Sequence, residues 1–237
     1  MAMQDNSVTG RAYGLLRAEL LGCRLPPGAQ LNIAALQSRL QLSQGAIREA
    51  LSRLTSEGLV EIERNRGFRA ACVSASGFKE LTEACMTVEL PCLRASIHNG
   101  DREWELNLLS TYHRAARTLD LVVGGMADIE AFSNERQGFY EALLGACDNH
   151  WLLWSWRLLY TQNMRYRHVY MPLAKFEREL NPTHASFLQA VLVRDADEAV
   201  RLAVENYGAV TNFIEALMAQ EAEPMRCNSP TSSTLPR

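Results

Sequence analysis

Residues 43–54 read SQGAIREALSRL, and this stretch decides how the first third of the chain folds. One face is apolar at the i, i+3, i+4, i+7 spacing of an amphipathic helix and is expected to be buried: Ile47, Ala50, Leu51 and Leu54. Ser43 can cap the start of this helix, and Gly58 is placed to end it. The opposite face carries Arg48 and Arg53, although the formal net charge of the chain is −3. A helix of this kind in an acidic protein suggests an anionic partner.

The segments on either side complete a recognisable order of elements. Two further helices are expected at 11–23 and 32–40, separated by RLPPG, whose prolines cannot continue a helix. After the third helix, LVEIERNRGFRAACV (residues 59–73) reads as two short strands, with Gly67 supplying a positive φ in the turn. Three helices followed by a β-hairpin are the order of a winged helix-turn-helix, which places its third helix in the DNA major groove.

The residues left on the outer face of the third helix and on the hairpin are the candidates for DNA contact. Small or polar residues in the first turn let a helix approach the groove closely, and an arginine one turn later reaches a guanine edge or a phosphate. Arginines on the hairpin suit phosphate or minor-groove contact. The alternative is an ordinary helical hairpin with solvated arginines. The predicted DNA-binding residues are Gln44, Gly45, Arg48, Arg53, Arg64, Asn65, Arg66 and Gly67.

Charge is unevenly distributed along the chain, and its hydropathy indicates which class of protein it belongs to. Residues 1–73 hold nine Arg against six Asp and Glu, whereas the remainder holds more acids than bases, so the N-terminal part is expected to meet a polyanion. No run approaches the roughly 18 apolar residues of a membrane span, and the N-terminus has no apolar signal segment. A cytoplasmic protein without membrane contact is expected. The six cysteines lack a C-x-x-C pair, which favours reduced thiols.

The rest of the chain shows helical periodicity alone. Helices are expected at 78–98, 101–119, 127–147, 151–171, 176–193 and 195–219. The predicted domains are a winged helix-turn-helix at 8–73, a linker at 74–77, a helical effector-binding and dimerisation domain at 78–220, and a disordered tail at 221–237. The fold class is therefore mainly α, with the winged helix followed by an all-α antiparallel helical bundle. No phosphate-binding loop, H-E-x-x-H motif or nucleophile–base set is present, so an enzyme is not expected.

Two parts of the sequence resemble a known family. Residues 24–70 resemble the GntR-type winged helix, whose members read PPG, a leucine-spaced helix, R-E-A-L, E-G-L-V and an N-R-G wing. FYEALLGACDNHWL, THASFLQAV and RDADEAVRLAVENY resemble the ligand-sensing C-terminal (FCD) domain of the FadR subgroup. The glycine-containing recognition turn is similar to that of carbon-starvation-type regulators. The resemblance implies a homodimeric bacterial transcription regulator, most often a repressor, that leaves a palindromic operator when a metabolite fills the helical domain.

The sequence departs from the family pattern at its functional positions. Gln44 stands where relatives usually have an arginine, so the operator sequence does not carry over. Many members bind a divalent metal through an Asp and three His. Alignment on the family motif puts Arg136, Tyr140 and Asn206 at three of these positions, and only His184 matches. A guanidinium repels a cation, so no metal or other cofactor is expected.

These departures point to an anion held by the protein itself. Cys85 replaces an arginine that in relatives often clamps the effector's carboxylate, and Arg136 is predicted to take over from that arginine and from the metal. Aromatic neighbours suit a planar ligand: Tyr140, Trp154, Tyr160 and Tyr166. The predicted effector is a small carboxylate, and its predicted binding residues are Arg136, Tyr140, His184, Asn206, Cys85, Arg165 and Arg167.

Three alternatives remain open at this point. Arg136 could pair with Glu135, Glu141 or another acid inside the protein, with the aromatic residues as plain core. The helical domain could serve dimerisation only and sense nothing. A helical-domain enzyme is the remaining alternative.

Overall fold

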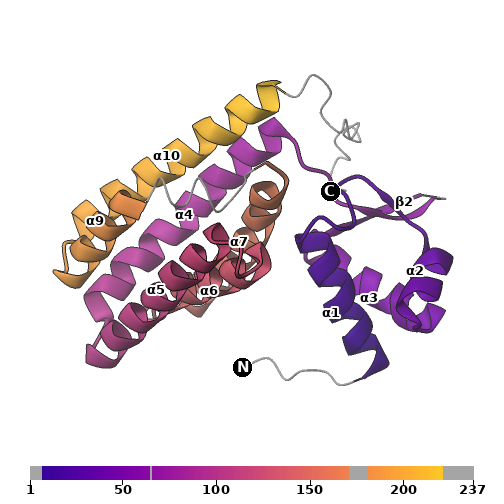
Figure 1. Cartoon of the computed structure of the whole chain (residues 1–237), viewed down its shortest axis with the longest axis horizontal. Coiled ribbons are helices and arrows are strands. Elements are labelled where there is room, and N and C mark those ends of the chain that lie inside the picture. The colour runs from indigo at the N-terminus through magenta and orange to yellow at the C-terminus, as the bar shows by residue number, and fades with distance from the viewer. Residues whose placement is uncertain (1–6, 65, 171–180, 221–237) are drawn as a thin grey trace, which may run out of the picture. The chain divides into compact units, whose positions relative to one another are not determined.

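The computed structural model describes residues 7–64, 66–170 and 181–220, which form two compact units (Figure 1). The first unit contains residues up to Gly77, and the second spans Phe78–Leu217. Helices dominate both units, and the first also holds a small antiparallel sheet. The predicted fold class, a winged helix-turn-helix followed by an all-helical domain, is confirmed.

The first unit has the predicted three helices and hairpin. The helices are α1 (Val8–Leu21), α2 (Ile33–Leu40) and α3 (Gln44–Ser56), and the hairpin strands are β2 (Val60–Glu63) and β3 (Gly67–Ala70). A further strand, β1 (Gln30–Leu31), pairs with β3, so the sheet order is β1-β3-β2. The sequence did not predict β1, because two residues are too few for an alternating pattern to appear.

Helix α3 begins and ends as its sequence predicts. The hydroxyl of Ser43 accepts a hydrogen bond from the backbone N–H of Ala46 at 3.3 Å. Gly58, at φ 68°, turns the chain out of the helix, and Gly67 adopts φ 85° in the hairpin turn. The apolar stripe of α3 is buried in one core with α1: Ile47, Ala50, Leu51 and Leu54 pack with Leu16 and Leu20. The opposite face of α3 is therefore left exposed.

The second unit is built from helices. They are α4 (Ala75–Asn99), α5 (Arg102–Val123), α6 (Ile129–Leu143), α7 (His150–Tyr170), α9 (Asn181–Leu192) and α10 (Ala196–Gln220) (Figure 1). All six correspond to predicted helices, although α5 runs four residues further and α6 ends four residues earlier. The start of the helix predicted at 176–193 and the tail predicted at 221–237 lie outside the described residues.

Two sequence expectations about the connection and the cysteines need correction. Helix α4 begins at Ala75, inside the predicted linker 74–77, because the hydroxyl of Ser74 caps it by accepting from the N–H of Gly77 at 3.1 Å. Cys23, Cys85, Cys92 and Cys147 form no disulfide, as expected, whereas Cys72 is disulfide-bonded.

Among the described helices, none combines the length and the apolar character needed to cross a bilayer.

Candidate functional site

The N-terminal end of α3 has an exposed outer face with small and polar side chains. Gln44, Gly45 and Arg48 are exposed, and the side chain of Arg48 forms no hydrogen bond or ion pair with the described part of the chain. A Cβ added at Gly45 would meet nothing within 4 Å, so the chain's own packing does not demand glycine there. Small residues beside an uncommitted arginine allow close approach to another molecule.

Arg53 is held differently, one and a half turns further along α3. Its guanidinium lies over the ring of Tyr13 on α1, 4.0 Å from the centroid, although the residue is exposed. The Tyr13 hydroxyl donates to Glu57, which also accepts from Arg17 Nε at 3.0 Å. Arg53 is thus held in place by a cluster that joins α1 and α3. A guanidinium held in this way is suited to contact a phosphate of the DNA backbone rather than a base edge.

The hairpin carries the other predicted contacts. Arg64 and Arg66 are exposed beside the turn that Gly67 permits, and neither forms an ion pair with the residues described. Arg69 pairs instead with Glu63 at 2.7 Å. Asn65 lies outside the described residues. Arg48 on α3 and Arg64 and Arg66 on the hairpin thus have no acidic partner among the described residues.

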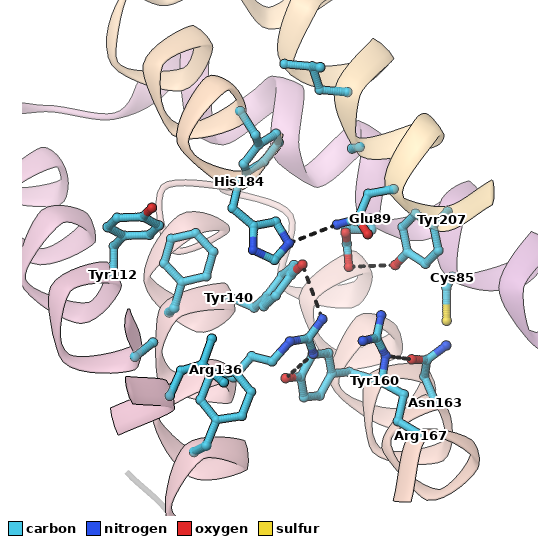
Figure 2. Close-up of a pocket in the computed structure, with 18 of the residues that line it drawn as sticks. Cys85, Glu89, Tyr112, Arg136, Tyr140, Tyr160, Asn163, Arg167, His184 and Tyr207 are labelled. Carbon is cyan, nitrogen blue, oxygen red and sulfur yellow. Dashed lines mark hydrogen bonds between the residues drawn. The ribbon is translucent and has the colours of Figure 1, made fainter. Parts of the chain in front are cut away.

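The second unit encloses a cavity between its helices (Figure 2). Six of the seven predicted effector-binding residues line it: Cys85, Arg136, Tyr140, Arg167, His184 and Asn206. Arg165 does not line it, since this side chain is buried and donates to Gln162 at 3.0 Å. The volume open to the centres of water molecules is about 80 Å³. Because one water needs about 10–15 Å³ on that measure, the cavity suits a compact ligand of about five to eight non-hydrogen atoms.

Arg136 on α6 is the buried cation of this cavity. Its side chain is 6% exposed, and its guanidinium donates to the hydroxyl of Tyr160 at 3.1 Å and to that of Tyr140 at 3.5 Å. The guanidinium also lies 4.8 Å from the centroid of the Tyr140 ring. The aromatic walls therefore orient the guanidinium at the cavity surface (Figure 2).

The acids that could have neutralised Arg136 locally face other partners. Glu135 accepts from Arg114 Nε at 3.0 Å, and Glu141 accepts from Gln137 at 3.0 Å. The pairing of Arg136 with either neighbour, left open by the sequence, is therefore not what the structure has.

His184 on α9 and Asn206 on α10 meet across the cavity wall. The Asn206 amide nitrogen lies 3.3 Å from His184 Nε2. The family's metal positions thus converge here, but this part of the wall offers one imidazole, an amide and a phenol beside a guanidinium. That donor set does not fit a divalent cation, because Arg136 places a fixed positive charge within the same cavity.

Glu89 on α4 is a cavity residue that sequence reasoning missed. It is 5% exposed, and it accepts hydrogen bonds from Trp156 Nε1 at 2.8 Å and from the Tyr207 hydroxyl at 2.9 Å. Burial raises the pKa of its carboxyl, while the two donors and the positive charges of Arg136 and Arg167 act in the opposite direction. A carboxyl and two guanidinium groups therefore share this one cavity.

The remaining predictions for the cavity are met unevenly. Burial, and then the charge of Glu89, raise the pKa of the Cys85 thiol to about 12, so that Cys85 is a neutral wall residue. Arg167 donates to Asn163 at 3.0 Å. Of the predicted aromatic neighbours, Tyr140 and Tyr160 line the cavity, whereas Tyr166 packs on Phe78 and Trp154 is 61% exposed. The last two were wrongly grouped, because helical spacing alone did not reveal which face of α7 is inward.

Comparison with known families matches both units separately. The model described as "Bacterial regulatory proteins, gntR family" matches residues 8–69, and the model "FCD domain" matches residues 80–208. These two matches follow the same order as the winged helix and the helical unit.

Named relatives extend over most of the chain. It is 32% identical to "Uncharacterized HTH-type transcriptional regulator BphR" of Paraburkholderia xenovorans, over 83% of this chain and 80% of that protein. It is 26% identical to "HTH-type transcriptional repressor GlaR" of Escherichia coli, over 87% and 96%.

Solved structures share the fold at low identity. A putative GntR transcriptional regulator from Rhodococcus sp. RHA1 superposes with a TM-score of 0.72 at 20% identity, covering 88% of this chain and 97% of that one. E. coli McbR/YncC gives a TM-score of 0.71 at 19% identity, covering 89% and 98%.

Proposed function

Since the chain belongs to the gntR family of bacterial regulatory proteins and carries an FCD domain, we propose that it is a transcription repressor released from its operator by a small carboxylate. It acts as a homodimer on a palindromic site, because two-fold symmetry in a dimer is matched by two inverted half-sites. Its family and relatives are transcription regulators, which removes the helical-domain enzyme that the sequence left open.

The buried guanidinium of Arg136 on the cavity wall is the observation that carries the effector proposal. A carboxylate meets a guanidinium with two parallel hydrogen bonds, and such charge-assisted bonds are roughly twice as strong as neutral ones. The partners of Arg136 include two phenol hydroxyls, at 3.1 and 3.5 Å, which a ligand carboxylate can supplement or replace. Arg167 adds a second positive charge to the same cavity.

A helical domain that only dimerises is the remaining alternative. Buried polar groups cost free energy unless they are hydrogen-bonded, so a purely structural domain would be expected to fill this space with apolar side chains. The wall instead presents Glu89, Arg136, Arg167 and Asn206. This polar lining favours a domain that senses a ligand.

The cavity chemistry also leads us to propose that the protein works without a metal. A cation would have to bind within reach of Arg136, with His184 as the one imidazole on that wall. A resident anion site made of protein side chains makes the metal unnecessary.

The test combines thermal shift with operator binding. Carboxylates are screened for stabilisation of the full chain, and a ligand at one hundred times its Kd should stabilise the fold by about 2.7 kcal/mol. The operator is selected from random duplexes, and the same carboxylate should release the protein from it. Arg136→Ala should abolish both effects while DNA binding persists, and Arg136→Lys should restore them only partly.

A matched control and a contrary outcome accompany this test. Arg157→Ala removes an exposed arginine from α7 and should respond as the wild type does. If Arg136→Ala is released by the carboxylate as readily as the wild type, the anion is held elsewhere and Arg167 becomes the candidate.

A further inference from the structure

Of the two carboxylate oxygens of Glu89, Oε2 accepts hydrogen bonds from protein side chains and Oε1 accepts none from the described residues. Two hydrogen bonds, from Trp156 Nε1 at 2.8 Å and from the Tyr207 hydroxyl at 2.9 Å, both end on Oε2. An indole N–H can only donate, so Oε2 must accept there. Oε1 makes no hydrogen bond with the described residues, although the side chain is 95% removed from solvent and lines the cavity. It therefore has capacity for a partner inside the cavity.

Asn206 repeats this arrangement from α10. Its amide nitrogen is directed at His184 Nε2, 3.3 Å away. Its carbonyl oxygen, Oδ1, is buried and accepts no hydrogen bond from the described residues. Leaving a buried acceptor unsatisfied costs about 1–3 kcal/mol, so such groups in a cavity wall are normally satisfied by a water or a ligand.

The two uncommitted acceptors share one part of the cavity. In Figure 2, Glu89, His184 and Tyr207 lie above Arg136 and Arg167, and Asn206 belongs with the upper group through its contact with His184. The guanidinium groups can only donate, whereas Glu89 Oε1 and Asn206 Oδ1 are available to accept. The cavity is thus chemically two-ended.

We propose that Glu89 Oε1 and Asn206 Oδ1 form an acceptor end that binds a hydrogen-bond donor of the effector, opposite the carboxylate held by Arg136. The effector is then a short carboxylate with a hydroxyl or an ammonium group at its far end. This rests on the proposed function for the placement of the carboxylate. A plain monocarboxylate leaves the acceptor end unsatisfied, and a dicarboxylate sets a second anion against Glu89.

The neighbours of Glu89 make Glu89→Gln an informative substitution. The glutamine oxygen can keep accepting from Trp156 and Tyr207, which directs its NH₂ group into the cavity. The side chain keeps its shape, but the exposed atom changes from an acceptor to a donor. The preference should therefore change from a terminal ammonium to a terminal carboxylate, while a hydroxyl, which both donates and accepts, is less affected.

The experiment uses a matched set of probes against the full chain. Straight-chain acids of three, four and five carbons are tested unsubstituted and with a terminal hydroxyl, ammonium or carboxylate, a size range that matches the cavity. Calorimetry should give the wild type an affinity about tenfold or more higher for a hydroxyl or ammonium form than for the unsubstituted acid of equal length. The better of these two arms identifies the donor.

The variants then locate the preference in the cavity. Glu89→Gln should lose the ammonium preference and gain affinity for the dicarboxylate, whereas Glu83→Gln, the same change on the exposed face of α4, should behave as the wild type. Asn206→Leu should reduce the donor preference while retaining affinity for the unsubstituted acid. It also keeps the test decisive if Glu89→Gln does not fold.

The outcomes separate this inference from the proposed function. Equal affinity for unsubstituted and donor-bearing acids, abolished by Arg136→Ala, would leave the carboxylate site standing and overturn the acceptor end. A wild-type preference for dicarboxylates would also overturn it, since Glu89 would then be acting as a protonated donor. Binding of none of these acids would remove the proposed effector class, and the acceptor end with it.

Discussion

Arg48 and Arg66 differ in what each can contribute to DNA binding. Arg48 follows the small first turn of α3, so Arg48→Ala should cost about 1–3 kcal/mol at one base pair and relax the sequence preference there. Arg66 lies on the hairpin, so Arg66→Ala should weaken binding to every duplex and lower the salt slope by about one. Gel shifts at several salt concentrations, with the selected operator and a scrambled duplex, measure both effects.

Arg102→Ala serves as the charge control for these two variants. It removes an exposed arginine from the start of α5, in the other unit. Its operator affinity should equal that of the wild type. Unchanged affinity in both Arg48→Ala and Arg66→Ala would mean that DNA meets a different surface of the winged helix.

Glu89 should make the stability of the helical unit depend on pH. Burial raises its folded-state pKa above the unfolded value of about 4.3, so the folded form binds its proton more tightly. The stability that this provides is complete below about pH 4.3 and is lost as the pH rises through the folded-state pKa. Glu89→Gln should lack this loss. The difference in Tm between the two proteins, followed upward from pH 4, measures it.

The contributions of neighbouring groups are controlled in the same comparison. Arg136 and Arg167 stay charged across this range, and Cys85, with a pKa of about 12, stays neutral. Glu83→Gln, an exposed change on the same helix, should keep the wild-type profile. Parallel Tm profiles for wild type and Glu89→Gln would show that Glu89 titrates as it does in the unfolded chain.

At the scale of elements, the N-terminal cap of α3 depends on a single side chain, that of Ser43. The Ser43 hydroxyl satisfies the N–H of Ala46 at 3.3 Å, so Ser43→Ala should destabilise the first unit by about 1 kcal/mol. Ser52→Ala, in the exposed interior of the same helix, should leave stability unchanged or slightly raised. Urea unfolding followed by circular dichroism compares the two, and equal midpoints would argue against the cap.

The elements were predictable wherever a local signal fixed them. Apolar spacing predicted α3. Ser43 begins this helix, Gly58 follows its end and Gly67 forms the hairpin turn, as expected. Local signals failed at β1, whose pairing partner lies some forty residues away. They also failed at Ser74, where residues typical of a linker act as a helix cap.

For the whole molecule, the proposed anion site predicts indifference to chelators. Protein purified without EDTA should carry no stoichiometric zinc, nickel or manganese, and EDTA should alter neither its Tm nor its operator affinity. The reason is the positive charge of Arg136 within the cavity that contains His184. Elemental analysis near one metal per chain, lost in His184→Ala, would contradict this prediction.

The candidate site could be predicted in part because it depends on which helix faces turn inward. Alignment with the family brought Arg136, Tyr140, His184 and Asn206 to one cavity, as the structure has them. Glu89 was missed, although it lies four residues after Cys85 and four before Leu93 on the buried stripe of α4. An acid on such a stripe was the available signal. Its partners on α7 and α10 come from far along the chain, and no local pattern reveals them.

The hydrogen bond between Trp156 and Glu89 also makes the protein its own optical reporter. Trp156 is almost fully buried with its indole N–H on the carboxylate, whereas Trp151 and Trp154 are 67% and 61% exposed. Iodide should quench the emission of the two outer indoles and leave that of Trp156 and of Trp104, which is 8% exposed and donates its N–H to the Leu143 carbonyl. A molecule entering the cavity beside Glu89 changes the electric field at the Trp156 indole, so the unquenched emission should shift in wavelength. The occupancy of the cavity can thus be followed by fluorescence in the unlabelled protein.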